Sequence, residues 1–144
     1  QEDPASHTYG GKRLANAAMF EPAGTIYVYF TYGMHYCVNI VTGPKDHGEA
    51  VLLRALEPVD GVELMQQRRH TQDVKNLCSG PAKLVQAMGI TKLHGGTNLM
   101  DGTLKLEPGF RPKRIIQTTR VGISKAIDQP WRFYAADNPF ISKP

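Results

Sequence analysis

The clearest pattern of hydrophobic and polar positions along the chain lies in residues 24–41. Ile26, Val28 and Phe30 alternate there with tyrosine and threonine, which is typical of a strand whose two faces differ. Residues 32–34 interrupt the alternation, and the glycine among them can adopt a positive φ. The pattern therefore predicts a β-hairpin with its tip at residues 32–34.

A strand and two helices are predicted after the hairpin. Residues 50–56 form a short apolar run that predicts a buried strand, with Arg54 as its one charged position. Asp60 is suited to cap a helix that continues to about Arg69. A second helix is predicted to begin at Pro81, which suits a first turn, and to end at Gly89. In the first helix, Val62, Leu64 and Met65 are predicted to lie on or near one face. In the second helix, Leu84, Val85 and Met88 are predicted to form the buried stripe.

The two ends of the chain show weaker patterns. Residues 1–20 are polar and rich in turn-forming residues, which predicts a loop. Short strands are predicted at 104–106, 114–118 and 131–135. No internal repeat or interdomain linker interrupts the sequence. Many strands combined with two helices favour a mixed α+β fold in a single domain.

Composition narrows the function classes without choosing one. The 144 residues suit one domain, and no stretch approaches the ~20 apolar residues of a membrane helix. The net charge of +4 is compatible with a polyanionic partner, although many basic domains bind nothing acidic. Neither Cys37 nor Cys78 lies in a CxxC spacing, which argues against a zinc site and favours a reducing, intracellular environment. The histidines show no HxH or HxxxH spacing, and GxSxG, P-loop and GxGxxG motifs are absent.

The tyrosines of the predicted hairpin have two interpretations. Tyr27 and Tyr29 share one strand face, and a half-buried aromatic sheet face would account for both. The alternative is a stacking wall for a flat, electron-poor ligand. Tyr32 is harder to explain by packing, because a turn tip offers little to pack against. A side chain that fills the gap left by a displaced base would project in this way.

Further positions could contact an anion or a reacting group. Arg54 must pair with a partner or face a polar cleft, unless its strand is an edge strand from which the side chain reaches solvent. The segment from Gly80 to Lys83 begins a helix, and it is either simply a good cap or a phosphate site built from free backbone N–H groups. Gly122 could form a second such site, because glycine lets the backbone approach a ligand closely.

Four blocks of sequence resemble the alkyladenine (3-methylpurine) DNA glycosylase family, in the family's order. The first block runs from residue 24 to Asn39 and includes GTIYVYFTYGM. The others are LLRALEP at 52–58, SGPAKL at 79–84, and RVGI at 120–123 followed by WRFY at 131–134. Together the blocks are highly specific and cover most of the chain, whereas any one of them alone would be a weak signal.

The resemblance implies a single compact domain with a curved, mostly antiparallel sheet, a few helices, and a protruding hairpin that enters the DNA minor groove. On the family's pattern, Tyr32 at the tip corresponds to the intercalating residue, with Met34 beside it. His7 and Tyr29 correspond to walls of the base pocket. Asn39 corresponds to the residue that crowds the exocyclic amino group of normal guanine.

The activity that the resemblance implies is that of a monofunctional DNA-repair glycosylase. Such an enzyme flips alkylated or deaminated purines, such as 3-methyladenine, 7-methylguanine and hypoxanthine, out of double-stranded DNA and hydrolyses the N-glycosidic bond. Arg54 and the backbone of Val121 would support the attacking water, and phosphates would bind at Gly80, Lys83 and Gly122. The implied protein is a monomer without cofactor or metal, located in the cytoplasm, the nucleoid or the nucleus.

One part of the family's pattern is missing. The general base is a glutamate in a Glu-x-Tyr pattern shortly before the position of His7, and residues 1–144 do not contain that pattern. We therefore expect the domain 1–144 to be N-terminally incomplete and, taken alone, inactive. The alternative function is a non-catalytic nucleic-acid-binding module of the same fold. A third class, a small-molecule transferase domain of similar topology, would not need a tyrosine at a hairpin tip.

Overall fold

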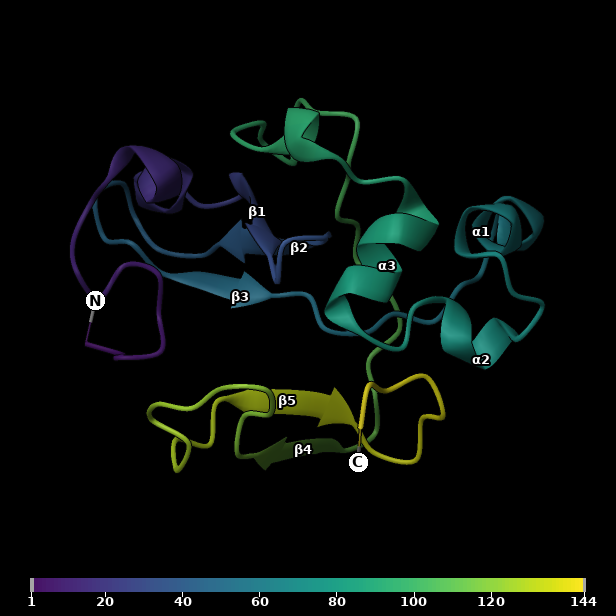
Figure 1. Cartoon of the computed structure of the whole chain (residues 1–144). Coiled ribbons are helices and arrows are strands. Elements are labelled where there is room, and N and C mark those ends of the chain that lie inside the picture. The colour runs from purple at the N-terminus through teal and green to yellow at the C-terminus, as the bar shows by residue number, and fades with distance from the viewer. Residues whose placement is uncertain (1, 144) are drawn as a thin grey trace.

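Two antiparallel sheets and a group of helices make up the computed structural model, which describes residues 2–143 (Figure 1). The first sheet has the strand order β1-β2-β3, and the second pairs β4 with β5. The elements in chain order are the 3-10 helix η1 (Leu14–Phe20), β1 (Ile26–Thr31), β2 (His35–Val41), β3 (Ala50–Leu52), α1 (Val62–Arg69), α2 (Val74–Leu77), α3 (Pro81–Met88), the 3-10 helix η2 (Lys92–His94), β4 (Ile115–Thr118) and β5 (Arg132–Ala135). This mixture of helices and antiparallel strands agrees with a mixed α+β fold. The described strands form two sheets, so a single curved sheet stays an expectation.

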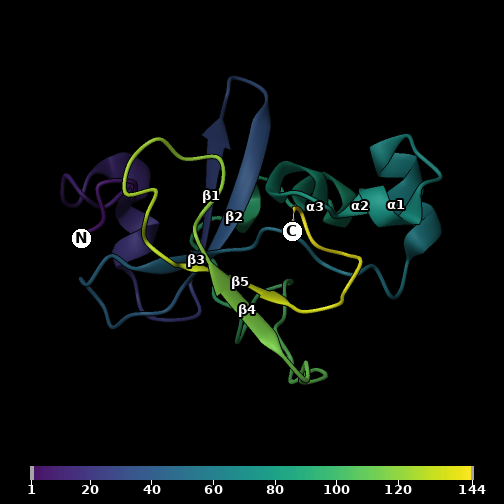
Figure 2. The same ribbon diagram turned by 90° about the horizontal axis from the view of Figure 1, so that it is seen from below.

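β1 and β2 form the predicted hairpin. Their last pair before the turn is Thr31 with His35. At the tip, Tyr32 and Gly33 have φ values of 51° and 68°, and the amide of Met34 donates a hydrogen bond to the carbonyl of Thr31 at 3.3 Å. Positive φ at both central positions is typical of a type I′ turn, whose twist fits two antiparallel strands. The hairpin extends beyond the neighbouring elements (Figure 2).

One face of the hairpin carries the main hydrophobic core. Ile26 and Val38 are each 1% exposed and pack in one cluster with residues of α3, where Leu84 is fully buried. Helix α3 has the predicted bounds. Pro81 occupies its first turn, and Gly89 follows its end with a φ of 68°. The hairpin is therefore fixed from one side, and its other face is left for the functional side chains.

α1 and α2 lie on the side of α3 that faces away from the first sheet (Figure 1). α1 begins after Gly61, which has a φ of 68°, and no side chain caps the helix, so the predicted cap at Asp60 is wrong. The predicted buried stripe of α3 is wrong at Met88, which is 37% exposed. In α1, Val62 and Met65 pack against the core, whereas Leu64 is 48% exposed. α2 was not predicted, because four residues are too few to show a helical period.

β3 is shorter and less buried than the strand predicted at 50–56. It ends at its third residue, and Val51 is 54% exposed. The chain then turns toward the helices, where the amide of Leu56 donates a hydrogen bond to the carbonyl of Cys78 at 3.2 Å. Arg54 consequently lies just beyond the strand rather than inside it.

Two other local predictions are also wrong. η1 lies within the segment predicted to be a loop, and its residues Met19 and Phe20 are 6% and 2% exposed. The ring of Phe20 lies so close to Gly48 that an added Cβ there would come within 2.7 Å of it. This long-range packing stabilises η1 and cannot be read from a mostly polar segment. The predicted strand at 104–106 is not formed, and no strand pairs with that segment in the described structure.

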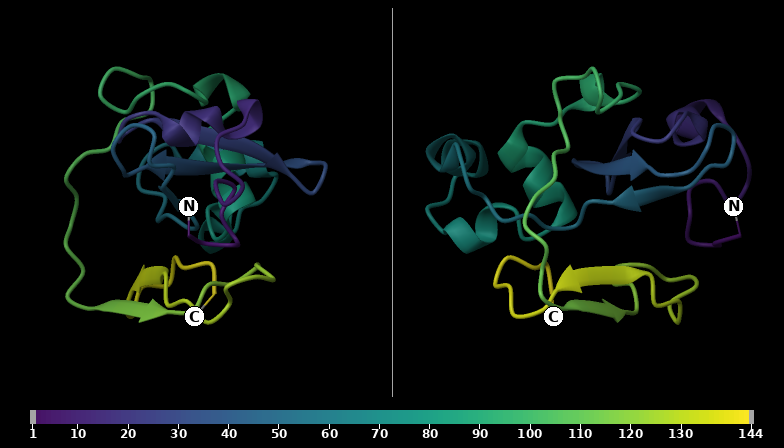
Figure 3. Two further views of the ribbon diagram at one scale, coloured as in Figure 1. Left: turned by 90° about the vertical axis from the view of Figure 1, so that its left-hand side faces the viewer. Right: turned by 180° about the vertical axis from the view of Figure 1, so that it is seen from behind.

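The ribbon of β4 and β5 lies beside the first sheet, on the side of β3 (Figures 1 and 3). Its bounds agree with the predicted strands at 114–118 and 131–135 to within one residue at each end. The loop between the two strands returns to the N-terminal segment, where Arg120 forms a salt bridge with Asp3. The N-terminal segment, the hairpin and this loop therefore converge.

Candidate functional site

The hairpin face opposite the core is aromatic and polar. Tyr27 and Tyr29 of β1 lie directly across from Asn39 and Cys37 of β2. Because cross-strand partners and every second residue share a face, the four side chains line one surface. The two tyrosine rings are stacked, with 5.6 Å between their centroids and 22° between their planes. The strand pairing thus builds an aromatic wall at the base of the protruding tip.

His7 lies against this wall. Its Nδ1 lies 3.0 Å from the hydroxyl of Tyr27, and its ring meets Tyr29 edge-on with 4.4 Å between the centroids. The amide of the Asn16 side chain donates a hydrogen bond to the carbonyl of His7 at 2.8 Å, which fixes the segment. Desolvation lowers the pKa of His7, so the imidazole is predominantly neutral at about pH 7.

Burial also keeps Tyr29 and Cys37 in their neutral forms. It raises the pKa of the Tyr29 phenol well above its usual value. Cys37 is 4% exposed, carries a free thiol, and has its pKa raised by the same cause. The wall therefore presents neutral groups to any ligand that stacks on it.

Arg54 supplies the positive charge of the site. Its Nη2 donates a hydrogen bond to the carbonyl of Val121 at 2.8 Å, across 67 residues of sequence. Burial lowers the pKa of Arg54, and the nearby charge of Arg132 lowers it further, although a guanidinium remains charged in either case. Gly122 has a φ of 75°, and a Cβ there would lie 3.3 Å from Nη2 of Arg54. A glycine at 122 therefore permits both the turn and the approach of the guanidinium.

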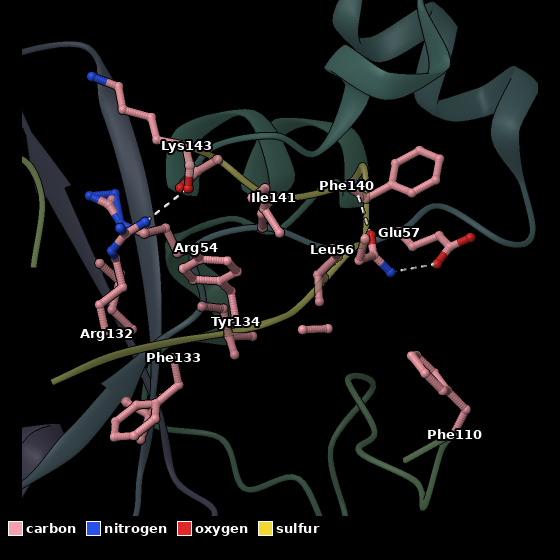
Figure 4. Close-up of a pocket in the computed structure, with 17 residues that line it drawn as sticks. Arg54, Leu56, Glu57, Phe110, Arg132, Phe133, Tyr134, Phe140, Ile141 and Lys143 are labelled. Atoms are coloured by element: carbon pink, nitrogen blue, oxygen red, sulfur yellow. Dashed lines mark hydrogen bonds between the residues drawn. The ribbon is translucent and has the colours of Figure 1, made fainter. Parts of the chain in front are cut away.

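A pocket of about 360 Å³ opens beside Arg54, between residues 51–57, β5 and the C-terminal segment (Figure 4). Arg54 and Arg132 lie next to each other at one end of it. Arg132 donates hydrogen bonds to the carbonyls of Thr119 and Lys143, each at 2.9 Å. The tyrosines of the wall are not among the residues that line this pocket. Arg54 lies close enough to Tyr29 and Cys37 for its charge to act on the pKa values of both, so it belongs to both surfaces.

Comparison with known proteins identifies the family. Residues 1–139 match the sequence model of the family described as methylpurine-DNA glycosylase (MPG). A relative from Methanoculleus marisnigri is 53% identical over 98% of this chain and 76% of its own. Relatives from Francisella tularensis and Nitrosospira multiformis are 49% and 43% identical, over 98% and 99% of this chain and 76% and 74% of theirs. All three bear the name 3-methyladenine DNA glycosylase as a provisional assignment.

This chain belongs to the methylpurine-DNA glycosylase family. The predicted resemblance is thereby confirmed. The family assignment makes the chain a DNA glycosylase, which is a hydrolase of DNA repair with DNA as its partner. Within residues 2–143, no three His, Cys, Asp or Glu side chains are grouped so that they could hold a metal ion. No helix in that part of the chain is long and apolar enough to cross a membrane.

Most of the glycosylase residues predicted from the sequence lie in one region. The wall and Arg54 bring together four segments of the chain, which contribute His7, Tyr29, Asn39, Arg54, Val121 and Gly122. Of the two interpretations of Arg54, the one in which it pairs with a partner agrees with its hydrogen bond to the Val121 carbonyl. The roles of these residues in binding and catalysis remain predictions.

The remaining predicted residues lie outside this cluster. Tyr32 and Met34 at the tip are 82% and 70% exposed. Gly80 and Lys83 lie at the start of α3, which packs against the other face of the hairpin. The ammonium group of Lys83 donates hydrogen bonds to Asn76 and to Ser79, so it already has partners within the protein. Phosphate binding at Gly80, Lys83 and Gly122 stays a prediction.

The contacts that hold the cluster together could not be predicted from the sequence. Tyr27 was assigned to a face but not to the hydrogen bond with His7. The salt bridge between Asp3 and Arg120 was not predicted at all. These residues are 117 positions apart, and no local pattern signals their pairing. Ala126, in the loop between β4 and β5, has a φ of 48°, and the sequence gives no signal of this conformation either.

Proposed function

We propose that this glycosylase flips an alkylated or deaminated purine out of double-stranded DNA, stacks it on the wall formed by Tyr29 and His7, and hydrolyses its N-glycosidic bond. The observation that carries the proposal is the position of this neutral aromatic wall. It lies at the base of a hairpin whose tip is exposed, with a half-buried arginine beside it. A flipped base needs a stacking surface, and the duplex needs a side chain to fill the space that the base vacates.

The neutral state of the side chains in the wall favours the binding of cationic bases. Purines methylated at N3 or N7 carry a positive charge, and a neutral electron-rich ring attracts a cation with about 0.5–2 kcal/mol. Tyr29 provides such a ring, because burial raises the pKa of its phenol. The neutral form of His7 avoids charge repulsion with the same base. We therefore propose 3-methyladenine and 7-methylguanine as substrates, with hypoxanthine held by stacking and shape alone.

Discrimination against normal bases is proposed to depend on Asn39. This residue is 8% exposed and lies across from Tyr27, on the same face as the wall. Its amide would meet the minor-groove edge of a purine stacked on Tyr29. Guanine carries an exocyclic amino group on that edge, whereas adenine and hypoxanthine do not. 7-Methylguanine carries the same group, so its selection over guanine is proposed to come from its positive charge and its weakened glycosidic bond. The extrusion step adds selectivity, because a damaged or mispaired base costs less to remove from the stack.

The hairpin tip is proposed to be the wedge. Tyr32 projects from a turn in which it already adopts a positive φ, and Met34 lies beside it. Tyr32 and Met34 are 82% and 70% exposed, and together they form a small apolar surface at the end of the protruding hairpin, which is the kind of feature that can mark an interaction site. Insertion into the minor groove would cover both side chains and fill the space left in the base stack.

The proposed chemistry breaks one bond and forms one. The water oxygen attacks the sugar C1′ through an oxocarbenium-like state, and the glycosidic electron pair leaves with the purine nitrogen. An N-methylated purine loses its positive charge in this step, so it departs as a neutral base without a proton donor. Hypoxanthine starts neutral, so it must gain a proton, from solvent or from an acid, as its glycosidic bond breaks. Arg54 and the Val121 carbonyl, which lie 2.8 Å apart, are proposed to support the water.

The proton of the water must go to a general base. The resemblance implies a glutamate in a Glu-x-Tyr pattern, and residues 1–144 contain no such pattern. Asp3 is a poor substitute, because its hydrogen bonds with Arg120 lower the pKa of its carboxyl. Among the described contacts of the wall there is no lysine that could act as a nucleophile. We therefore propose a monofunctional enzyme that leaves the DNA strand uncut. That it acts as a monomer is a separate expectation, which rests on the family resemblance.

The test is single-turnover release of 3-methyladenine, 7-methylguanine and hypoxanthine from otherwise identical duplexes. Release of the free base with an intact strand is expected from the full protein that carries the general base, with faster release of the cationic bases. Residues 1–144 alone are expected to release no base. The Tyr29→Leu variant tests the role of the ring, because it keeps an apolar side chain of moderate size but has no aromatic ring. It should slow release of the cationic bases more than release of hypoxanthine. Tight binding to damaged duplex without release of any base would instead favour the non-catalytic binding module.

A further inference from the structure

Asp3 and Arg120 form a nearly buried salt bridge between two distant parts of the chain. Nη1 of Arg120 donates a hydrogen bond to Oδ2 of Asp3, and Nη2 donates to Oδ1 at 2.9 Å. The side chains are 15% and 19% exposed, respectively. This two-pronged geometry fixes the relative position and the orientation of both partners, which a single contact cannot do. The pairing also lowers the pKa of Asp3 and raises that of Arg120.

Asp3 shapes the backbone that presents His7. Its Oδ1 accepts a hydrogen bond from the amide of Ala5 at 3.0 Å, and its carbonyl accepts one from the amide of Ser6 at 2.9 Å. His7 follows directly after this turn. A movement of Asp3 would therefore be transmitted to the imidazole that packs against Tyr29.

Arg120 shapes the loop that presents Val121. Its Nη2 also donates a hydrogen bond to the carbonyl of Ala126 at 3.0 Å, which closes the loop 121–126. Its guanidinium lies over the ring of Trp131, 5.1 Å from the centroid. The next residue in the chain, Val121, accepts the hydrogen bond of Arg54. Arg120 thus holds both ends of the loop whose backbone faces Arg54.

We propose that Asp3 and Arg120 are positioning residues, which set the distance between the base-stacking side of the site, at His7, and the water-supporting side, at Val121. This inference rests on the proposed function. Without the salt bridge, His7 would keep its hydrogen bond with Asn16, and Val121 would keep its hydrogen bond with Arg54. The direct link between these two sides of the site would be lost. Catalysis depends on such spacing, because a displacement of about 1 Å can cost roughly 100-fold in rate.

The variants Asp3→Asn and Arg120→Gln test the proposal in the full protein. Each is expected to reduce single-turnover release of 3-methyladenine by roughly 10- to 100-fold. Affinity for undamaged duplex should stay within about threefold, since neither residue is proposed to contact the backbone of the DNA. The double variant Asp3→Arg with Arg120→Asp should recover a substantial part of the lost rate, because it restores the pair with the partners exchanged. Asp137→Asn is the matched control, since Asp137 pairs with Arg114 at 3.1 Å on the exposed side of the same ribbon.

Amide hydrogen exchange provides a readout that does not depend on activity. Asp3→Asn should speed exchange at Ser6 and in the loop 121–126, while Asp137→Asn should not. If the wild-type protein releases no base, the proposed function fails, and the exchange experiment still decides whether the pair couples the two segments. Unchanged exchange in Asp3→Asn would overturn the coupling. An unchanged rate of release in a folded Asp3→Asn protein, or a loss of rate that the exchanged pair does not recover, would overturn the positioning role.

Discussion

Tyr32 and His7 belong to the same proposed site, but different kinds of contact hold them in place. The tip around Tyr32 is fixed by its own turn, with a hydrogen bond between residues 31 and 34. His7 is held by Tyr27 and Asn16 and linked through Asp3 to Arg120, far along the chain. The tip therefore depends on local sequence, and the wall depends on tertiary structure. We expect substitutions at the tip to change the affinity for damaged DNA. Substitutions around the wall are expected to change the rate of base release.

The largest effect is expected for Arg54→Ala. Loss of the guanidinium removes the hydrogen bond to Val121 and the charge beside the reacting sugar, and excision should fall by about 100-fold or more. Single-turnover release of 3-methyladenine measures this effect. Arg114→Ala is the control, because Arg114 is largely exposed and lies at the start of β4. Arg54→Lys should recover little, since an ammonium group cannot reproduce the planar donor pair. Release within about threefold of wild type would contradict the role of Arg54.

A smaller effect is expected for Tyr32→Ala at the tip. Affinity for a damaged duplex should fall by about tenfold, because the space left by the flipped base is no longer filled. The melting temperature should not change, since the side chain is 82% exposed. Titration of a fluorescent duplex and thermal unfolding measure the two quantities. Val59→Ala, at a position 77% exposed and remote from the hairpin, is the control for loss of an apolar surface residue. Wild-type affinity in Tyr32→Ala would rule out the wedge.

A change in specificity rather than in rate is expected for Asn39→Ser. The shorter side chain relieves the crowding at the minor-groove edge of guanine, so release of normal guanine should rise by about threefold to tenfold relative to hypoxanthine. The ratio of the two single-turnover rates measures this effect and cancels any general loss of activity. An unchanged ratio would mean that Asn39 is a structural residue of β2 and does not contribute to the selection of bases.

The smallest effect is expected for the pH dependence of stability at His7. Desolvation lowers the folded-state pKa of His7 from its ordinary value of 6.5, so the unfolded chain binds more protons as the solution becomes acidic. The stability from neutral His7 is complete above about pH 6.5 and is lost as the pH falls toward the folded-state pKa. His7→Gln should therefore flatten the decline in unfolding free energy between about pH 7 and pH 5. Urea unfolding at several pH values measures the slope, and an identical slope in the two proteins would contradict the prediction.

The same contrast explains what the sequence could and could not predict. The hairpin and α3 follow from local chemistry, because Gly33, Pro81 and Gly89 determine the turn and the two helix ends. η1 was missed because Phe20 is buried against a turn nearly thirty residues away, at Gly48. Burial of this kind leaves no periodic signal in the segment itself.

The same distinction between local patterns and long-range contacts applies to the candidate site. Tyr27 and Tyr29 could be assigned to one face from strand alternation alone. The place of Asn39 was expected from the family resemblance, because the pairing register that puts it across from Tyr27 comes from the structure. The meeting of Arg54 with Val121 was expected from the family resemblance, since their spacing in the sequence carries no such information. The Asp3–Arg120 pair joins common residues in unremarkable contexts, so the structure was needed to find it.

The burial of Cys37 has a consequence for the survival of the protein under chemical stress. Agents that methylate purines also attack nucleophiles in proteins, and the thiolate is the most reactive form of cysteine. Cys37 lies across from Tyr29 on the hairpin face that carries the wall. It is nevertheless only 4% exposed, and burial raises the pKa of its thiol. Cys78 is 1% exposed and is shielded in the same way. Cys37 and Cys78 of this chain are thus buried with raised pKa values, which slows their reaction with the electrophiles that create methylated purines.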